Sequence, residues 1–277
     1  MPPPAQTGTA IAISTEELEA ADAVALDPPY LFGRRLPATT VAERTRRAAA
    51  MGAVVARRFG PVLAHGARHR QVNTHDWVPA LRHTFEDLGT TFLKFGQLVG
   101  SAPGVFGEGV AAEFRSCLDT GPAVPADEVR ALIEDQLGRS LEDAFATFDP
   151  EPIGRASIAV VHRATTHEGD EVAVKVLRPG VDRRVAVDLD LLQPLLAKVV
   201  EFTGEQAAVS MLQQFDGFRL QLGEELDLRN EARAMDHFRD LLGVVDLPMV
   251  TVPMVYPNLS NGRVLTIRRD DLRAIAC

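Results

Sequence analysis

The chain has 277 residues, 46% of them hydrophobic, and a formal net charge of −9. This size and apolar content suffice for one large or two small domains with a sizeable core. The acidic balance, without a basic stripe interleaved with aromatic residues, excludes nucleic-acid binding. No uncharged apolar run approaches the roughly 18 residues of a membrane span, and no signal peptide pattern begins the chain. We therefore expect a cytoplasmic protein, and peripheral contact with a membrane stays open.

The first half of the chain is predicted to be helical. Residues 1–39 are expected to be largely disordered, since their start is rich in Pro, Ala and Thr. Apolar residues then recur at helical spacing in three stretches. The expected helices span 40–67, 78–100 and 125–138. Together they predict a helical extension over residues 40–148, which Asp149-Pro150 closes.

The pattern changes to β-rich segments after residue 149. Two runs of β-branched residues flank a Gly-containing turn at 167–170, which is typical of a β-hairpin. Long helical patterns and two further short strands follow. The expected strands are 157–166, 171–177, 249–255 and 263–267, and the expected helices are 185–202 and 205–242. The sequence therefore predicts an α+β chain with an antiparallel sheet and long helices.

One strand lysine and a group of downstream acids could carry chemistry. In Val172-Ala173-Val174-Lys175, alternate side chains face opposite sides of a strand. An ordinary surface lysine is one interpretation of Lys175, although small Ala173 on the same side would leave room for an adenine ring. Glu224, Glu225, Asp227 and Glu231 share one predicted helix. They form either a solvated acidic face or the partners of a lysine or a metal–phosphate group.

Five short motifs occur in a fixed order between residues 81 and 267. They are Lys94-Phe95-Gly96-Gln97, then Ala156-Ser157-Ile158-Ala159 with Val161-His162, then Val172-Ala173-Val174-Lys175, then Arg178-Pro179-Gly180-Val181, and finally Glu225-Leu226-Asp227 with Glu231-Ala232. In this order the chain resembles the AarF/UbiB family of atypical, protein-kinase-like kinases. The resemblance implies a kinase-like small lobe over residues 149–277, with the helical extension packed on it.

The resemblance also implies roles for individual residues. Lys175 would contact nucleotide phosphates and Glu231 would be its partner on a helix. Glu225 and Asp227 would be the acidic pair near the nucleotide. An alanine-rich loop would replace the glycine-rich loop of kinases, and a motif of the extension would restrain protein-kinase activity. These correspond to Ala156, Ser157, Ile158 and Ala159 for the loop, and to Lys94, Gly96 and Gln97 for the motif. His162, inside a strand, is interpreted as structural.

The implied ligands are ATP and Mg²⁺. Weak binding is expected, because Val160 stands where the family usually has a glutamine. No catalytic loop follows the small lobe, so the large lobe is expected to be absent, phosphoryl transfer incomplete, and the catalytic and metal-binding residues unassigned. The family also suggests a link to quinone or isoprenoid-lipid metabolism.

Two other functions fit the same sequence. One is a non-catalytic interaction or regulatory module, and the other is a truncated product of a full-length kinase-like ATPase. A small lobe without its large lobe is expected to expose apolar surface near Val255 and Val264. This favours self-association or a protein partner besides the nucleotide.

Overall fold

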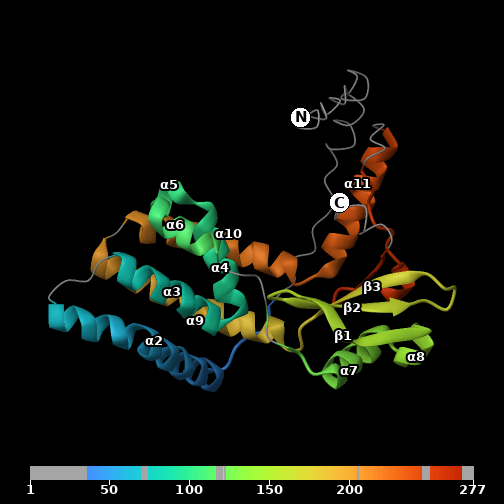
Figure 1. The fold of residues 1–277 in the computed structure, drawn as a ribbon, viewed down its shortest axis with the longest axis horizontal. Helices are drawn as coiled ribbons and strands as arrows, with labels where there is room; N and C mark the ends of the chain where they lie inside the picture. The colour runs from blue at the N-terminus through green and yellow to red at the C-terminus, as the bar shows by residue number, and fades with distance from the viewer. Residues whose placement is uncertain are drawn as a thin grey trace, which may run out of the picture.

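The structure is a computed structural model, and it describes residues 36–69, 74–116, 121, 123–204, 206–244 and 250–269. A layer of helices lies beside a four-stranded antiparallel sheet (Figure 1). The helices of this layer are α2 (Val41–His69), α3 (Thr74–Leu88), α4 (Thr90–Ser101), α5 (Pro103–Phe106), α6 (Glu108–Arg115), α9 (Val181–Thr203) and α10 (Gln206–Glu225). The predicted α+β class is therefore confirmed.

The sheet has the strand order β1-β2-β3-β4. Its strands are β1 (Thr147–Arg155), β2 (Ala159–Thr165), β3 (Glu171–Leu177) and β4 (Val264–Arg268). Two helices, α7 (Ala126–Leu137) and α8 (Leu141–Ala144), pack on one of its faces. Helix α11 (Leu228–Val244) contacts β4, and a short 3-10 turn, η1 (Pro257–Leu259), precedes that strand.

Several predicted helices are confirmed and two are wrong in one respect. The predictions for 40–67, 125–138 and 185–202 correspond to α2, α7 and α9. The helix predicted over 78–100 is interrupted by Gly89, whose φ of 87° lies in the left-handed region and separates α3 from α4. The helix predicted over 205–242 is likewise two helices, because α10 ends at Glu225 and α11 begins at Leu228.

The strand predictions succeed for β2, β3 and β4 but miss β1 and fail before β4. The two strands of the predicted hairpin are confirmed as β2 and β3, and the last one as β4. The edge strand β1 was not predicted, since Pro150 and Pro152 argue against a strand. An edge strand tolerates them, and its pairing with β2 shifts register on both sides of Pro152. The strand predicted over 249–255 is wrong for residues 250–254; Val255 forms only an isolated bridge to Ile267.

Two hydrophobic cores cover the two faces of the sheet. Val172 and Val174 pack with α7 and α8, whereas Ala173 packs with the helical layer. This is the alternation that the sequence predicted for β3. Val264 is fully buried in the first of these cores, so the prediction of exposed apolar surface at this residue is wrong. The physical reason is that α7 and α8 close this face of the sheet.

A buried ion pair ties the helical layer together. The Asp188 carboxylate on α9 is fully buried and accepts a hydrogen bond from the Arg47 Nε of α2 at 2.6 Å. It also accepts one from the Thr91 hydroxyl of α4 at 2.9 Å. Arg47 donates further to the Leu88 carbonyl at the end of α3, at 2.7 Å. One arginine and one aspartate therefore join α2, α3, α4 and α9.

Candidate functional site

Two lysines from distant parts of the chain line one pocket. Lys175 comes from β3 and Lys94 from α4, and the pocket has a volume of about 410 Å³. We call it the two-lysine pocket. Its other lining residues are Ala156, Ile158, Gln221, Glu224, Glu225, Asp227, Leu228, Asn230 and Glu231. The structure thus brings together seven of the ten residues that the sequence assigned to a nucleotide site.

The first of the two lysines forms the predicted ion pair. The Lys175 Nζ lies 2.5 Å from the Glu231 Oε2, which confirms the expected contact. Lys175 shares its face of β3 with Ala173, and Glu231 lies in the first turn of α11. The side chains are 26% and 36% exposed. The pair therefore lies at the mouth of the pocket, where each charge stabilises the other but remains open to an incoming ligand.

The second lysine pairs with a different acid. The Lys94 Nζ lies 3.0 Å from the Glu225 Oε2, and Glu225 is the last residue of α10. Unpaired carboxylates are unfavourable at the C-terminal end of a helix, so the Lys94 ammonium group also offsets the helix dipole there. Gln97 lies one turn after Lys94 and lines an adjoining pocket of about 400 Å³ that also includes Lys94 and Glu225. The helical extension thus reaches into the two-lysine pocket.

Asp227 lies between two helices rather than within one. The sequence predicted that Glu225, Asp227 and Glu231 share a single helix, and this is wrong because the chain turns at Leu226–Asp227. The Asp227 carboxylate accepts two hydrogen bonds from the Arg229 guanidinium, at 2.9 and 2.5 Å, and these raise the pKa of Arg229. Asp227 is only 4% exposed. Gly262 packs closely against its carboxylate, because a Cβ added at Gly262 would lie 3.1 Å from the Asp227 Oδ1.

Only part of the predicted alanine-rich loop faces the pocket. Ala156 and Ile158 line it, whereas Ser157 and Ala159 do not, since both are almost fully buried. The expectation that Ala173 leaves room for an adenine ring is also wrong. Ala173 is buried in the core of the helical face and is not part of the pocket wall.

Two polar residues of the pocket, Gln221 and Asn230, were not among the residues that the sequence singled out. Gln221 lies one helical turn before Glu225, and this i,i+4 spacing was the signal that could have identified it. Asn230 donates from its Nδ2 to the Glu224 carbonyl at 2.9 Å, which fastens the start of α11 to the end of α10. No local pattern reveals a contact of this kind.

His162 has a structural environment, in line with its interpretation from the sequence. Its Nδ1–H donates to the Asp149 carbonyl at 2.9 Å, and its ring stacks on Phe148 with centroids 5.0 Å apart. Burial lowers the pKa of His162, because the charged imidazolium is disfavoured away from water, and the Asp149 carbonyl offsets this only in part.

The pocket combines ammonium groups with carboxylates. Within the ranges that the structure describes, no three carboxylate, imidazole or thiolate groups converge closely enough to ligate a metal on their own. Mg²⁺ commonly takes one or two carboxylates and completes its shell with water and phosphate oxygens. The donor set therefore fits a cation that arrives with a phosphate ligand.

No helix in the described part of the chain has the length and apolar character needed to cross a membrane.

Comparison with known proteins identifies relatives of this chain. The family model described as the ABC1 atypical kinase-like domain matches residues 116–271, more than half of the chain. The uncharacterized Mycobacterium tuberculosis protein Rv0647c is 42% identical over 69% of this chain and 39% of its own length. An uncharacterized chloroplastic aarF domain-containing protein kinase of Arabidopsis thaliana is 36% identical over 68% and 35%. The probable protein kinase UbiB of Cellvibrio japonicus is 33% identical over 68% and 34%. The chain thus spans between a third and two fifths of these curated relatives.

Proposed function

Because the chain belongs to the AarF/UbiB family of ABC1 atypical kinase-like proteins, we propose that its two-lysine pocket binds the phosphates of ATP together with Mg²⁺. The observation that carries this proposal is the Lys175–Glu231 pair at 2.5 Å in the same pocket as Lys94 and Glu225. A strand lysine held by a helix glutamate is the arrangement with which kinase-like folds place a cation at nucleotide phosphates.

The chain's own residues would divide the work in this pocket. Glu231 orients the Lys175 ammonium, which neutralises phosphate charge, and the small side chain of Ala156 leaves room for the phosphates to approach the loop. Mg²⁺ would supply neutralisation of the remaining phosphate charge. Glu225 and Asp227 are the carboxylates that could hold it, and each now pairs with a cation, Lys94 or Arg229. Ligand binding would therefore exchange existing ion pairs for new ones.

Phosphoryl transfer is a proposal for a protein of the length of the curated relatives, of which this chain spans between a third and two fifths. We propose that Lys94 and Gln97 restrain transfer to protein substrates, since both lie at the pocket on a helix of the extension. We assign no catalytic base to the described residues. The family resemblance likewise supports, as a proposal, a place for the whole protein in quinone or isoprenoid-lipid metabolism.

Calorimetric titration of the 277-residue chain with ATP, with and without Mg²⁺, tests the proposal. Lys175→Ala should weaken ATP binding by tenfold or more, which is about the size of one lost charge-assisted contact. Lys198→Ala is the matched control, because Lys198 is exposed on α9 and lies outside the pocket. The proposal fails if the wild-type chain binds no nucleotide, or if the two lysine variants bind ATP equally well.

A further inference from the structure

Two side chains from outside the alanine-rich loop between β1 and β2 donate hydrogen bonds to its backbone carbonyls. The Thr90 hydroxyl of α4 donates to the Ser157 carbonyl at 2.8 Å. The Arg178 guanidinium donates to the Ala156 carbonyl from Nε at 3.0 Å and from Nη2 at 2.9 Å. Three side-chain hydrogen bonds thus converge on two consecutive peptide groups of a short loop.

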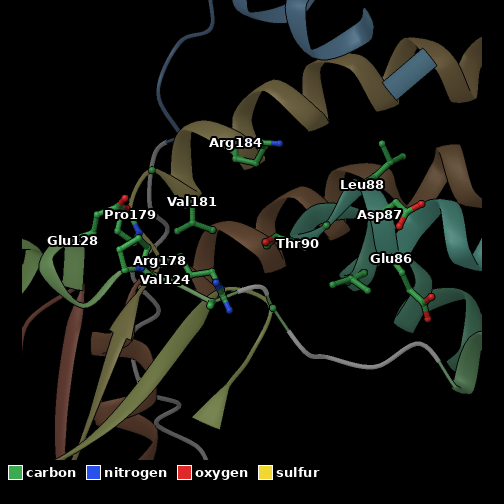
Figure 2. A pocket seen from close by; sticks show the side chains of 16 residues that line it. Glu86, Asp87, Leu88, Thr90, Val124, Glu128, Arg178, Pro179, Val181 and Arg184 are labelled. Atoms are coloured by element: carbon green, nitrogen blue, oxygen red, sulfur yellow. The ribbon is translucent and has the colours of Figure 1, made fainter. Parts of the chain in front are cut away.

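These side chains line a second cavity on the other side of the loop. This rear pocket has a volume of about 380 Å³ and includes both Thr90 and Arg178. Figure 2 shows it between Glu86, Asp87 and Leu88 of the helical layer and Val124, Glu128 and Pro179 beside the sheet. The loop itself contributes Ala156 and Ile158 to the two-lysine pocket. Its Ala156 and Ser157 carbonyl oxygens accept hydrogen bonds from Arg178 and Thr90, two side chains that line the rear pocket.

The main chain around the loop is pinned as well. The Arg155 carbonyl accepts from the Gly121 N–H at 3.3 Å, and the Ile158 carbonyl accepts from the Arg178 N–H at 2.9 Å. Gly121 also lies directly against the Arg178 guanidinium, since a Cβ at this position would be 2.0 Å from Nη2. Every carbonyl from Arg155 to Ile158 therefore has a fixed partner.

We propose that Thr90 and Arg178 are positioning residues for nucleotide phosphates, because they turn the carbonyls of the loop away from the two-lysine pocket. This inference rests on the proposed nucleotide-binding function. Carbonyl oxygens repel phosphate oxygens, whereas backbone N–H groups attract them. The loop has no glycines at residues 156–159, so its backbone has fewer accessible conformations than a glycine-rich loop, and the hydrogen bonds from Thr90 and Arg178 select one of them.

The helix that supplies Thr90 also supplies Lys94. The two residues are one helical turn apart on α4 and so lie on the same side of it. Thr91, between them, bonds to the buried Asp188 of α9 instead. The first turn of α4 is thus fixed to the loop by one threonine and to the helical layer by the next. These neighbouring threonines offer a matched pair of variants.

The test compares ATP with adenosine, which has no phosphates, in calorimetric and NMR titrations of the 277-residue chain. Thr90→Val removes the hydroxyl and keeps the shape, and it should weaken ATP binding by about threefold to tenfold while leaving adenosine binding unchanged. Thr90→Ser restores a hydroxyl and should restore ATP affinity. Thr91→Val should lower stability but leave the ratio of the two affinities as in the wild type.

Hydrogen exchange provides an independent measurement without ligand. The Ala156 N–H bonds to the Ala159 carbonyl across the loop at 2.9 Å, and its exchange should accelerate in Thr90→Val but not in Thr91→Val. The inference is wrong if Thr90→Val binds ATP like the wild type while Lys175→Ala does not. It is also wrong if ATP and adenosine weaken together, if Thr90→Ser fails to restore ATP affinity, or if Ala156 exchange is unchanged. A wild-type chain that binds no nucleotide would overturn the proposed function and this inference together.

Discussion

The ion pair between Arg47 and Asp188 predicts a large loss of stability when only one partner is removed. Asp188 is fully buried and Arg47 is 12% exposed, so solvent screens this pair little. Arg47→Met would keep most of the side-chain volume and leave the Asp188 carboxylate with only the Thr91 hydroxyl among the partners described above. Removing one partner of a buried pair typically costs about 3–5 kcal/mol, because an uncompensated charge remains in the interior.

Thermal and urea unfolding monitored by circular dichroism would measure this cost. For a chain of this size each kcal/mol shifts the melting temperature by about 2–4 °C, so Arg47→Met should melt roughly 6–20 °C below the wild type. Arg46→Met is the matched control, since Arg46 is the exposed neighbour on the same helix. It should change the free energy of unfolding by less than about 0.5 kcal/mol.

The double variant Arg47→Met/Asp188→Leu separates the buried charge from the lost contacts. Asp188→Leu removes the buried carboxylate charge that Arg47→Met leaves without a cation, so the double variant should be more stable than the single variant. The reasoning is refuted if Arg47→Met unfolds within about 1 kcal/mol of the wild type, which is the scale of an exposed ion pair. It is also refuted if the double variant is the less stable of the two.

Two further predictions concern a helix junction and a buried histidine. Gly89→Ala should destabilise the chain by about 1–2 kcal/mol, because the φ of Gly89 is 87°, although nothing lies within 4 Å of the added Cβ. Gly52→Ala, inside α2 with equally open space, should instead stabilise the chain by about 0.5–1 kcal/mol. Equal effects of the two substitutions in urea unfolding would contradict the argument. Burial lowers the pKa of His162 in the folded state, so the unfolded chain takes up a proton at this residue first as the pH falls below 6.5. The contribution of neutral His162 to the free energy of unfolding is therefore present above that pH and is lost progressively below it. Between pH 7.5 and pH 5.5, the urea midpoint of unfolding should therefore fall more in the wild type than in His162→Gln. An equal fall in both proteins would show that His162 does not cause the pH dependence of stability.

Much of the sheet could be predicted from the sequence because its central strands follow a simple rule. In β3 the alternation of Val172 and Val174 with Ala173 and Lys175 matches two cores on opposite faces. The edge strand β1 could not be predicted, because its prolines and shifted register reflect its position at the margin of the sheet and not any local preference.

The site was predictable where family motifs identified residues and less so where packing decides which atoms are exposed. Lys175 and Glu231 meet as expected, and Lys94 reaches the same pocket from the extension. The burial of Ser157 and Ala159 depends on the hydrogen bonds that the loop accepts from Thr90 and Arg178. Both of these residues are distant from the loop in sequence. Their contacts leave no periodic signal in the chain.

The junction between α10 and α11 explains how two acids of the site come to face one pocket. In the single helix predicted over residues 205–242, Glu225 and Glu231 would point in directions about 120° apart. The chain turns between them because Asp227 caps the next helix, accepting from the Arg229 N–H at 3.2 Å, and because the Leu228 N–H donates to the Gly262 carbonyl at 3.1 Å. Glu231 thereby gains a first-turn position that the helix dipole favours, whereas Glu225 ends its helix and needs the Lys94 ammonium. The placement of both acids therefore depends on a tertiary contact with the segment before β4, which helical periodicity cannot reveal.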